Sequence, residues 1–213
     1  MPNDEVKFPV QPIVSEYVQA LSALAENSFM NSMNRVLHVL NSARDHGSTI
    51  YIAGNGGSAS TASHWVNDLG KATKRSDRAP IRVMSLSDNV SWLTALANDE
   101  GYDRVFAGQL ENFAKPGDVL VLISASGNSP NLLRAAEMAK ARSVSTVALL
   151  GFDGGALRDM VDEYLLVPSK KGAYGLVESG HSILCHILTA CLTEARQAGA
   201  QLASSGRNNG SPA

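Results

Sequence analysis

The sequence has few cysteines, no apolar run of membrane-spanning length and little net charge. Its 213 residues contain two cysteines, Cys185 and Cys191, whose separation would point them to different sides of a helix. We therefore expect no disulfide and a reducing, cytoplasmic compartment. No apolar run approaches the roughly 18 residues of a membrane span, and we expect no signal peptide. A net charge of −2 with interspersed acids and bases predicts no face that binds nucleic acid.

What the chain does contain is a regular alternation of two patterns. Short apolar runs predict five β-strands, at residues 49–53, 80–86, 118–124, 145–151 and 163–167. Helical stretches separate them, at residues 58–69, 89–98, 103–113, 131–141 and 155–161. Strands that alternate with helices favour βαβ units and a parallel sheet covered on both faces. The chain is long enough to bury a full α/β core of this kind.

The two ends of the chain carry different patterns. Residues 1–12 are polar and rich in proline, and we expect a flexible arm there. Residues 13–46 predict one or two long helices, which we expect to pack on the flank of the sheet and against a second subunit. A final long helix is predicted over residues 176–197, and residues 199–213 are expected to be disordered. Residues 13–198 are therefore interpreted as one domain.

A glycine-rich turn follows the first predicted strand. Gly54-Asn55-Gly56-Gly57 breaks the strand, and Ser58 begins the next helix. A strand, a glycine turn and a helix N-terminus place several backbone N–H groups around one point, which suits an anion and most often a phosphate. The spacing is neither G-x-G-x-x-G nor a P-loop, so a nucleotide-dependent kinase or dehydrogenase is disfavoured.

A second polar loop, Ser124-Ala125-Ser126-Gly127-Asn128-Ser129, follows the third predicted strand. Its hydroxyls and backbone donors could surround the oxygens of a phosphate. The alternative is a serine-rich turn in which Ser129, just before Pro130, is an ordinary helix N-cap. Because ligands bind at the carboxyl ends of parallel strands, we expect the two loops to form one phosphate site.

Ionisable side chains follow the first loop and recur in the last helix. His64 and Asp68 are four residues apart and share a helix face, which is also the spacing of an ordinary surface pair. Glu178 can share a face with either His181 or His186. His186 has apolar neighbours, among which a lone histidine usually fills the core. These groups could bind a divalent metal such as zinc or act as acid and base without one, and spacing leaves both open.

Together these motifs resemble a known family. The run GNGGS-x5-H-x3-D, the loop SASGNS, the FDGG at 152–155 and the terminal E-x7-H are similar to the sugar isomerase (SIS) domain, over residues 14–197. Within it they most resemble phosphoheptose isomerases, which interconvert sedoheptulose 7-phosphate and manno-heptose 7-phosphate. The resemblance implies a three-layer αβα sandwich with a five-stranded parallel sheet. It also implies a homotetramer with active sites between subunits.

The resemblance also assigns roles to residues. Asp68 would be the catalytic base and His186 its acid/base partner. The metal set, for zinc, would be His64, Asp68, Glu178 and His186. The expected substrate and phosphate contacts are Asn55, Gly56, Gly57, Ser58, Asn89, Ser124, Ser126, Ser129 and Glu178.

The chain departs from the family pattern at several of these positions. Asp68 is one methylene shorter than the family's glutamate, and Glu178 replaces a glutamine. Asn89 stands where an aspartate is common, and the arginine usually found shortly before the Glu178 position is absent. These changes shift charge within the expected site, and they could suit a different phosphosugar or a different metal geometry.

The expected activity is therefore aldose–ketose isomerisation of sedoheptulose 7-phosphate to D-glycero-D-manno-heptose 7-phosphate through an enediol(ate). Two alternatives remain at this point. One is a non-catalytic SIS-fold adaptor of the type that associates with the replication initiator, although such relatives lack the catalytic pair present here. The other is a phosphosugar isomerase or sensor of different specificity.

Overall fold

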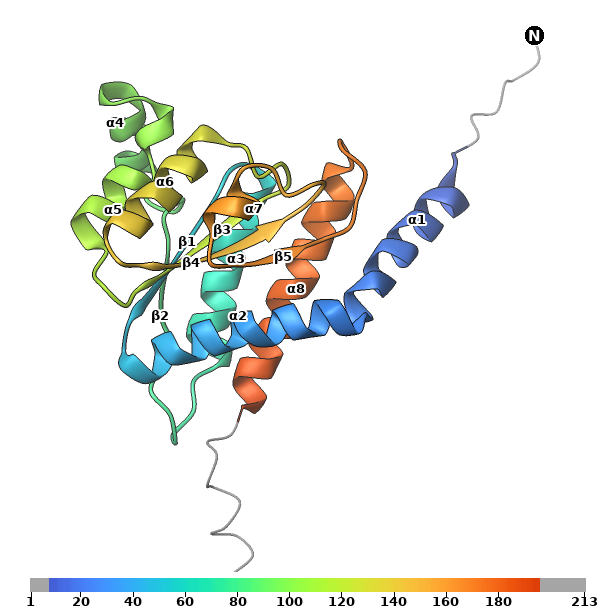
Figure 1. Ribbon diagram of the computed structural model, residues 1–213, viewed down its shortest axis with the longest axis horizontal. Helices are drawn as coiled ribbons and strands as arrows, with labels where there is room; N and C mark the ends of the chain where they lie inside the picture. The colour runs from blue at the N-terminus through green and yellow to red at the C-terminus, as the bar shows by residue number, and fades with distance from the viewer. Residues whose placement is uncertain (1–7, 196–213) are drawn as a thin grey trace, which may run out of the picture.

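A five-stranded parallel sheet organises residues 8–195, the part of the chain that the computed structural model describes (Figure 1). The strand order is β2-β1-β3-β4-β5, and every neighbouring pair is parallel. All five predicted strands are confirmed, with ends shifted by one or two residues: β1 Thr49–Gly54, β2 Arg82–Ser85, β3 Val119–Ser124, β4 Ser145–Leu150 and β5 Glu163–Leu166. The central strand β3 is buried along its whole length, as a strand covered on both faces must be.

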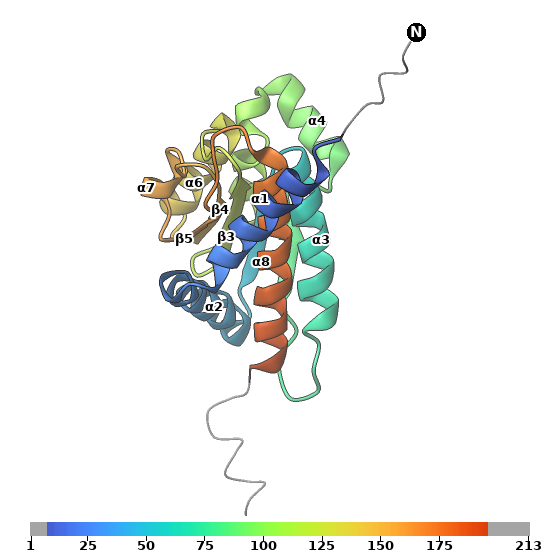
Figure 2. The same cartoon turned by 90° about the vertical axis from the view of Figure 1, so that its right-hand side faces the viewer.

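Helices cover both faces of the sheet and complete a three-layer sandwich, which confirms the predicted fold class (Figures 1 and 2). Side chains alternate along each strand, so that Ile50 and Ile52 of β1 pack on one face and Tyr51 and Ala53 on the other. The first face carries α2 Asn27–His46, α3 Gly57–Ala72 and α8 Tyr174–Glu194. The second carries α4 Val90–Asp99, α5 Ala107–Phe113, α6 Pro130–Ala141 and α7 Leu157–Met160.

The N-terminal helical segment is two α-helices rather than one. Helix α1 spans Val10–Ser22 and leads through the short 3₁₀ turn η1 Ala23–Ala25 into α2. Glu26 has an extended backbone, which separates the two. Because α1 begins at Val10, residues 10–12 belong to a helix and not to the predicted arm. The rest of that prediction, at residues 1–7, and the predicted tail at 199–213 lie outside the described residues.

Two other predicted helices have different bounds in the structure. The stretch predicted at 103–113 is divided into the 3₁₀ turn η2 Tyr102–Arg104 and helix α5. The final helix begins at Tyr174, two residues earlier than predicted, which places Tyr174 and Glu178 on the same face of one helix.

Helix α8 is long and apolar enough to cross a membrane by length and composition alone, contrary to the expectation that no run approached this limit. Half of its most apolar 18-residue stretch is buried inside the fold, and Leu184, Cys185 and Leu188 pack in the core. A core helix passes the same test, so α8 is the central packing helix of this face of the sheet.

Cys185 is buried, Cys191 is exposed and both are free, which confirms that they point to different sides of the helix.

Candidate active site

A cavity lies where the chain reverses its direction across the sheet. From β1 the chain moves to β2 at one edge, then returns to β3 on the other side of β1, so the carboxyl ends of β1 and β3 form a topological switch point. The cavity there, called the switch-point cavity below, has a volume of about 300 Å³. It brings together eight of the predicted contacts: Asn55, Gly56, Gly57, Ser58, Ser124, Ser126, Ser129 and Glu178.

The glycine turn shapes the β1 side of the switch-point cavity. Gly56, the N-cap of α3, has a φ of 53° and a ψ of −122°, a backbone conformation that residues other than glycine strongly disfavour. At Gly57 a Cβ atom would lie 2.5 Å from the Glu178 carboxyl carbon, so a larger residue there would displace the Glu178 carboxyl group from this position. The first turn of α3, with the buried hydroxyl residue Ser58, therefore opens directly into the cavity.

The serine loop shapes the β3 side. Ser124 Oγ accepts a hydrogen bond from the Gly127 N–H at 3.0 Å, which closes the turn and leaves the hydroxyl proton free to be donated. Ser129 occupies the N-cap position of α6, yet within the described residues its side chain makes no capping hydrogen bond. Because Ser129 lines the cavity instead, its hydroxyl is available to a ligand, which argues against the ordinary N-cap alternative.

The charge around the switch-point cavity is unusual for an anion site. Among the residues described, no lysine or arginine lines it, and the one charged lining residue is Glu178.

Tyr174, which was not predicted as a contact, also lines the switch-point cavity. Its spacing of four residues from Glu178 is the signal by which the sequence could have identified Tyr174. Asn89 is not among the lining residues. Its side-chain oxygen accepts a hydrogen bond from the Trp92 N–H and caps α4, so its predicted contact with the substrate stays a prediction.

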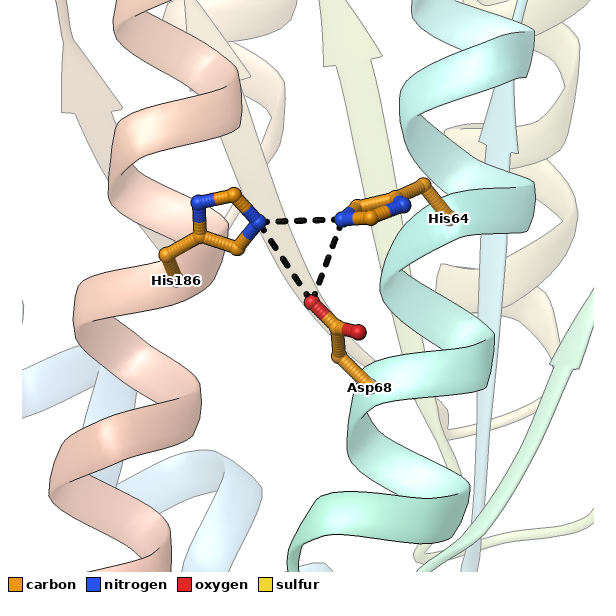
Figure 3. A group of neighbouring side chains, drawn as sticks. All are labelled: His64, Asp68 and His186. Atoms are coloured by element: carbon orange, nitrogen blue, oxygen red, sulfur yellow. Dashed lines mark hydrogen bonds and ion pairs between the residues drawn. The ribbon is translucent and has the colours of Figure 1, made fainter.

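A second constellation, the His–Asp cluster of His64, Asp68 and His186, lies further along the same helices (Figure 3). The two Nε2 atoms of His64 and His186 are 2.9 Å apart. Asp68 Oδ2 lies 3.2 Å from His64 Nε2 and 3.6 Å from His186 Nε2. Both histidine side chains are more than half exposed, whereas the carboxylate is 22% exposed, so the cluster opens to the surface.

The register between α3 and α8 creates this cluster. Trp65, the residue after His64, is fully buried, and its Nε1 donates to Thr189 Oγ1 of α8 at 3.1 Å. Thr189 Oγ1 donates in turn to the Cys185 carbonyl at 2.8 Å. This buried link lies one residue from His64 and one helical turn from His186, so it holds the two histidines opposite each other.

The structure also separates the two histidines of α8. His181, not His186, is the core histidine: it is fully buried, and its Nε2 donates to the Leu150 carbonyl at 3.1 Å. Burial lowers the pKa of His181 to about 4, so the ring is neutral. His186 is exposed despite its apolar sequence neighbours, because Leu184, Cys185 and Leu188 pack in the core while His186 faces His64 of α3.

Glu178 is not part of the cluster, which corrects the predicted four-residue metal set. Among the described residues the group of close ligand atoms comprises His64, Asp68 and His186. Glu178 lies eight residues before His186 on α8, about 12 Å along the helix axis. Its carboxyl group rests against Gly57 in the switch-point cavity.

Comparison with known proteins agrees with this geometry. The SIS domain family model matches residues 15–151. A phosphoheptose isomerase of Helicobacter pylori (strain P12) is 38% identical over 182 residues, which cover 84% of this chain and 93% of that protein. The chain belongs to the phosphoheptose isomerase family of SIS-domain proteins.

Solved structures of the family superpose on most of the chain. A phosphoheptose isomerase from Neisseria gonorrhoeae matches with a TM-score of 0.79 and 30% identity, covering 87% of this chain and 97% of that one. A phosphoheptose isomerase from Francisella tularensis matches with a TM-score of 0.81 and 27% identity over the same shares. The sandwich described above is thus the fold of these phosphoheptose isomerase structures.

The His–Asp cluster in this family member fits a divalent metal. Two imidazole nitrogens and a carboxylate oxygen are ligands that zinc takes, and a tetrahedral site with bonds of about 2.0–2.1 Å places its ligand atoms about 3.3 Å apart. The observed separations of 2.9, 3.2 and 3.6 Å bracket that value. Three protein ligands with an open fourth position are the arrangement of a catalytic zinc site rather than a structural one.

Proposed function

We propose that this chain is an aldose–ketose isomerase that converts sedoheptulose 7-phosphate to D-glycero-D-manno-heptose 7-phosphate. One observation carries the proposal: an anion-sized polar cavity and the His–Asp cluster lie along the same two helices. Gly57 and His64 are seven residues apart on α3, which is about 10 Å along its axis. A phosphosugar chain could extend over that distance with its phosphate in the cavity and its carbonyl at the cluster.

The reaction moves a proton between adjacent carbons through an enediol(ate) and needs a base, an acid and stabilisation of an oxyanion. In our proposal Asp68 removes the proton next to the carbonyl, and His186 exchanges protons with the substrate oxygens. The serine and glycine loops hold the phosphate, so binding energy from this remote group positions the reacting carbons. Asp68 is the least exposed member of the cluster, and this partial shielding from water strengthens its interaction with the substrate.

We further propose that His64, Asp68 and His186 would hold zinc. Because the His186 Nε2 that would bind the ion cannot also carry a proton, His186 would exchange protons through Nε2 only when no ion is bound. Bound there, the ion would supply electrostatic stabilisation of the negative charge that develops on the substrate oxygen. The donor set and its spacing support this proposal. Metal analysis of the purified protein tests it: about one zinc per chain is expected, and His64→Gln should lose it.

The two alternatives differ in what the site must do. An adaptor of the replication-initiator type needs no reaction centre, and it is not favoured because both Asp68 and His186 are present and face one site. A phosphosugar sensor, or an isomerase of different specificity, would retain the switch-point cavity. The Glu178 carboxylate within that cavity is the feature that supports an altered specificity.

Turnover of sedoheptulose 7-phosphate, measured with and without added zinc, tests the proposed activity. Asp68→Asn and His186→Gln should each lower kcat about 10²–10⁴-fold, because each removes a proton-transfer group. His46→Gln, at an exposed position on α2, is the matched control and should leave kcat unchanged. Phosphosugar binding without turnover in the wild type would favour the sensor, and normal turnover of His186→Gln would remove that residue from the mechanism.

We also propose a homotetramer with active sites shared between subunits. Helix α1 supports an oligomer because it extends away from the sandwich and buries none of its residues (Figure 1). Val10, Ile13, Val14 and Val18 form one apolar face and are 49–63% exposed. The number of four subunits rests on the family resemblance.

The mass of the particle in solution tests the proposed assembly. Light scattering should give four times the chain mass, and the double variant Val14→Asp, Val18→Asp should give a smaller particle. A wild-type monomer across a wide concentration range would refute the assembly.

We propose a cytoplasmic location on the ground that Cys185 and Cys191 are both free thiols.

A further inference from the structure

Three segments far apart in the sequence meet at the side chain of Asn55. Asn55 follows β1 and lines the switch-point cavity. Asn131 lies in the first turn of α6 and is 2% exposed. Tyr102 belongs to η2 and is 56% exposed. Neither Asn131 nor Tyr102 is among the residues that line the cavity, so neither is placed to contact a ligand there.

The two asparagines form a reciprocal pair of amide hydrogen bonds. Asn55 Nδ2 donates to Asn131 Oδ1 at 3.0 Å, and Asn131 Nδ2 donates to Asn55 Oδ1 at 2.9 Å. The Tyr102 hydroxyl donates to the same Asn55 Oδ1 at 3.0 Å. Two bonds to one carboxamide fix its plane, and the Tyr102 hydroxyl, which donates in the observed arrangement, adds a third bond on the oxygen side.

Counting donors and acceptors shows what Asn55 can still offer. A carboxamide oxygen has two lone pairs, and Asn131 and Tyr102 occupy both. The nitrogen has two N–H groups, of which Asn131 takes one. One N–H remains, on the side chain that lines the switch-point cavity. Asn55 can therefore donate to a ligand there but has no lone pair left with which to accept.

The partners of Asn55 are themselves held in place. Asn131 follows Ser129 and Pro130, so it connects the β1 loop to the serine loop on the other side of the cavity. The turn η2 is tied to α6 by Arg134, whose Nε lies 3.8 Å from Asp103 Oδ2. The network thus spans the switch point and links both halves of the predicted phosphate site.

We infer that Asn131 and Tyr102 are positioning residues that hold the Asn55 carboxamide so that it presents a single N–H donor to an oxygen of the bound phosphosugar. This inference rests on the proposed function, since it names how that substrate is bound. Asn55 makes the contact, and the other two residues act only through it. The network does not include Asp68 or His186, so it sets affinity and leaves the chemical step alone.

A double-mutant cycle on the dissociation constant of sedoheptulose 7-phosphate, measured by calorimetry, tests this inference. Tyr102→Phe removes one hydrogen bond at an exposed position and should weaken binding about three- to tenfold. Asn131→Ala removes two and should weaken it about tenfold or more. In an Asn55→Ala background both changes should have no further effect, within about twofold, because residues that share one target are not additive.

Controls separate positioning from general destabilisation. Tyr164→Phe, a half-buried tyrosine on β5 away from the cavity, should leave the dissociation constant unchanged. Tyr102→Phe should raise KM and leave kcat unchanged. A loss of folded protein would instead lower the apparent kcat and leave KM unchanged.

Two results would overturn the inference: single variants that bind within twofold of the wild type, or variants whose effects persist in the Asn55→Ala background. Calorimetry does not require turnover. A wild type that binds but does not isomerise the sugar would therefore refute the proposed reaction and still allow the cycle to be read.

Discussion

Lowering the pH from 8 to 5 should destabilise this protein through one buried histidine. His181 is fully buried on α8, its Nε2 donates to the Leu150 carbonyl, and its Nδ1 is buried without a hydrogen-bond partner in the described part of the chain. Burial holds its pKa at about 4, below the ordinary 6.5. The unfolded chain binds a proton below about pH 6.5, whereas the folded chain does not until about pH 4. Stability is therefore fully present above pH 6.5 and is lost as the pH falls toward 4.

The pKa difference sets the size of the effect. Each pKa unit corresponds to about 1.4 kcal/mol, so the free energy of unfolding should fall by about 3 kcal/mol once the pH is below 4. At pH 5, part of the way through that window, the loss is about 2 kcal/mol. Folded domains are stable by only about 5–15 kcal/mol, so this single group is a large part of the total.

Urea unfolding at pH 8, 6 and 5 measures the effect, at one fixed protein concentration because an oligomer's stability depends on it. His181→Gln keeps an N–H donor for Leu150 but cannot be protonated. The stability of the wild type relative to this variant should fall by about 2 kcal/mol between pH 8 and pH 5. His46→Gln, at an exposed position on α2, serves as the control and should follow the wild type. If His181→Gln instead loses stability in parallel with the wild type, the burial argument is refuted.

Two further predictions concern the switch-point cavity and the link between α3 and α8. Glu178→Gln should tighten the binding of inorganic phosphate about tenfold. The reason is that a carboxylate about 5 Å from a bound phosphate repels it by about 1–3 kcal/mol. An unchanged affinity, measured by calorimetry, would show that Glu178 turns away when an anion binds. Thr189→Val should lower the free energy of unfolding by about 1–3 kcal/mol, since it leaves the buried Trp65 Nε1 without an acceptor. It should also lower turnover by disturbing His64 and His186, and urea unfolding with a sedoheptulose 7-phosphate assay measures both effects.

Much of the switch-point cavity could be predicted from the sequence because its residues follow strands. The carboxyl ends of parallel strands share one edge of a sheet, so the loops that begin at Gly54 and Ser124 had to lie near each other once both strands were identified. The hydroxyl-rich composition of the serine loop then indicated an anion. Asn131 could not be assigned in this way, since its pairing with Asn55 depends on how α6 leaves the sheet.

The placement of residues on helices was less predictable. Periodicity shows which residues share a face of α8, but not which neighbouring element that face meets. His186 has apolar sequence neighbours and resembled a core residue, while His181 could equally have faced the site. The resemblance to the family had placed His186 in the site, and the packing of α8 between the sheet and α3 brings His186 beside His64 and buries His181.

The sequence by itself determined the alternation of elements, the two polar loops and the pairing of His64 with Asp68, since each depends on local spacing. The family resemblance put both His186 and Glu178 in one metal set, and only the tertiary structure decided that His186 completes the His–Asp cluster while Glu178 belongs to the switch-point cavity. The physical reason is the register between α3 and α8, which depends on the packing of buried side chains such as Trp65 against Thr189 and not on any spacing along the chain.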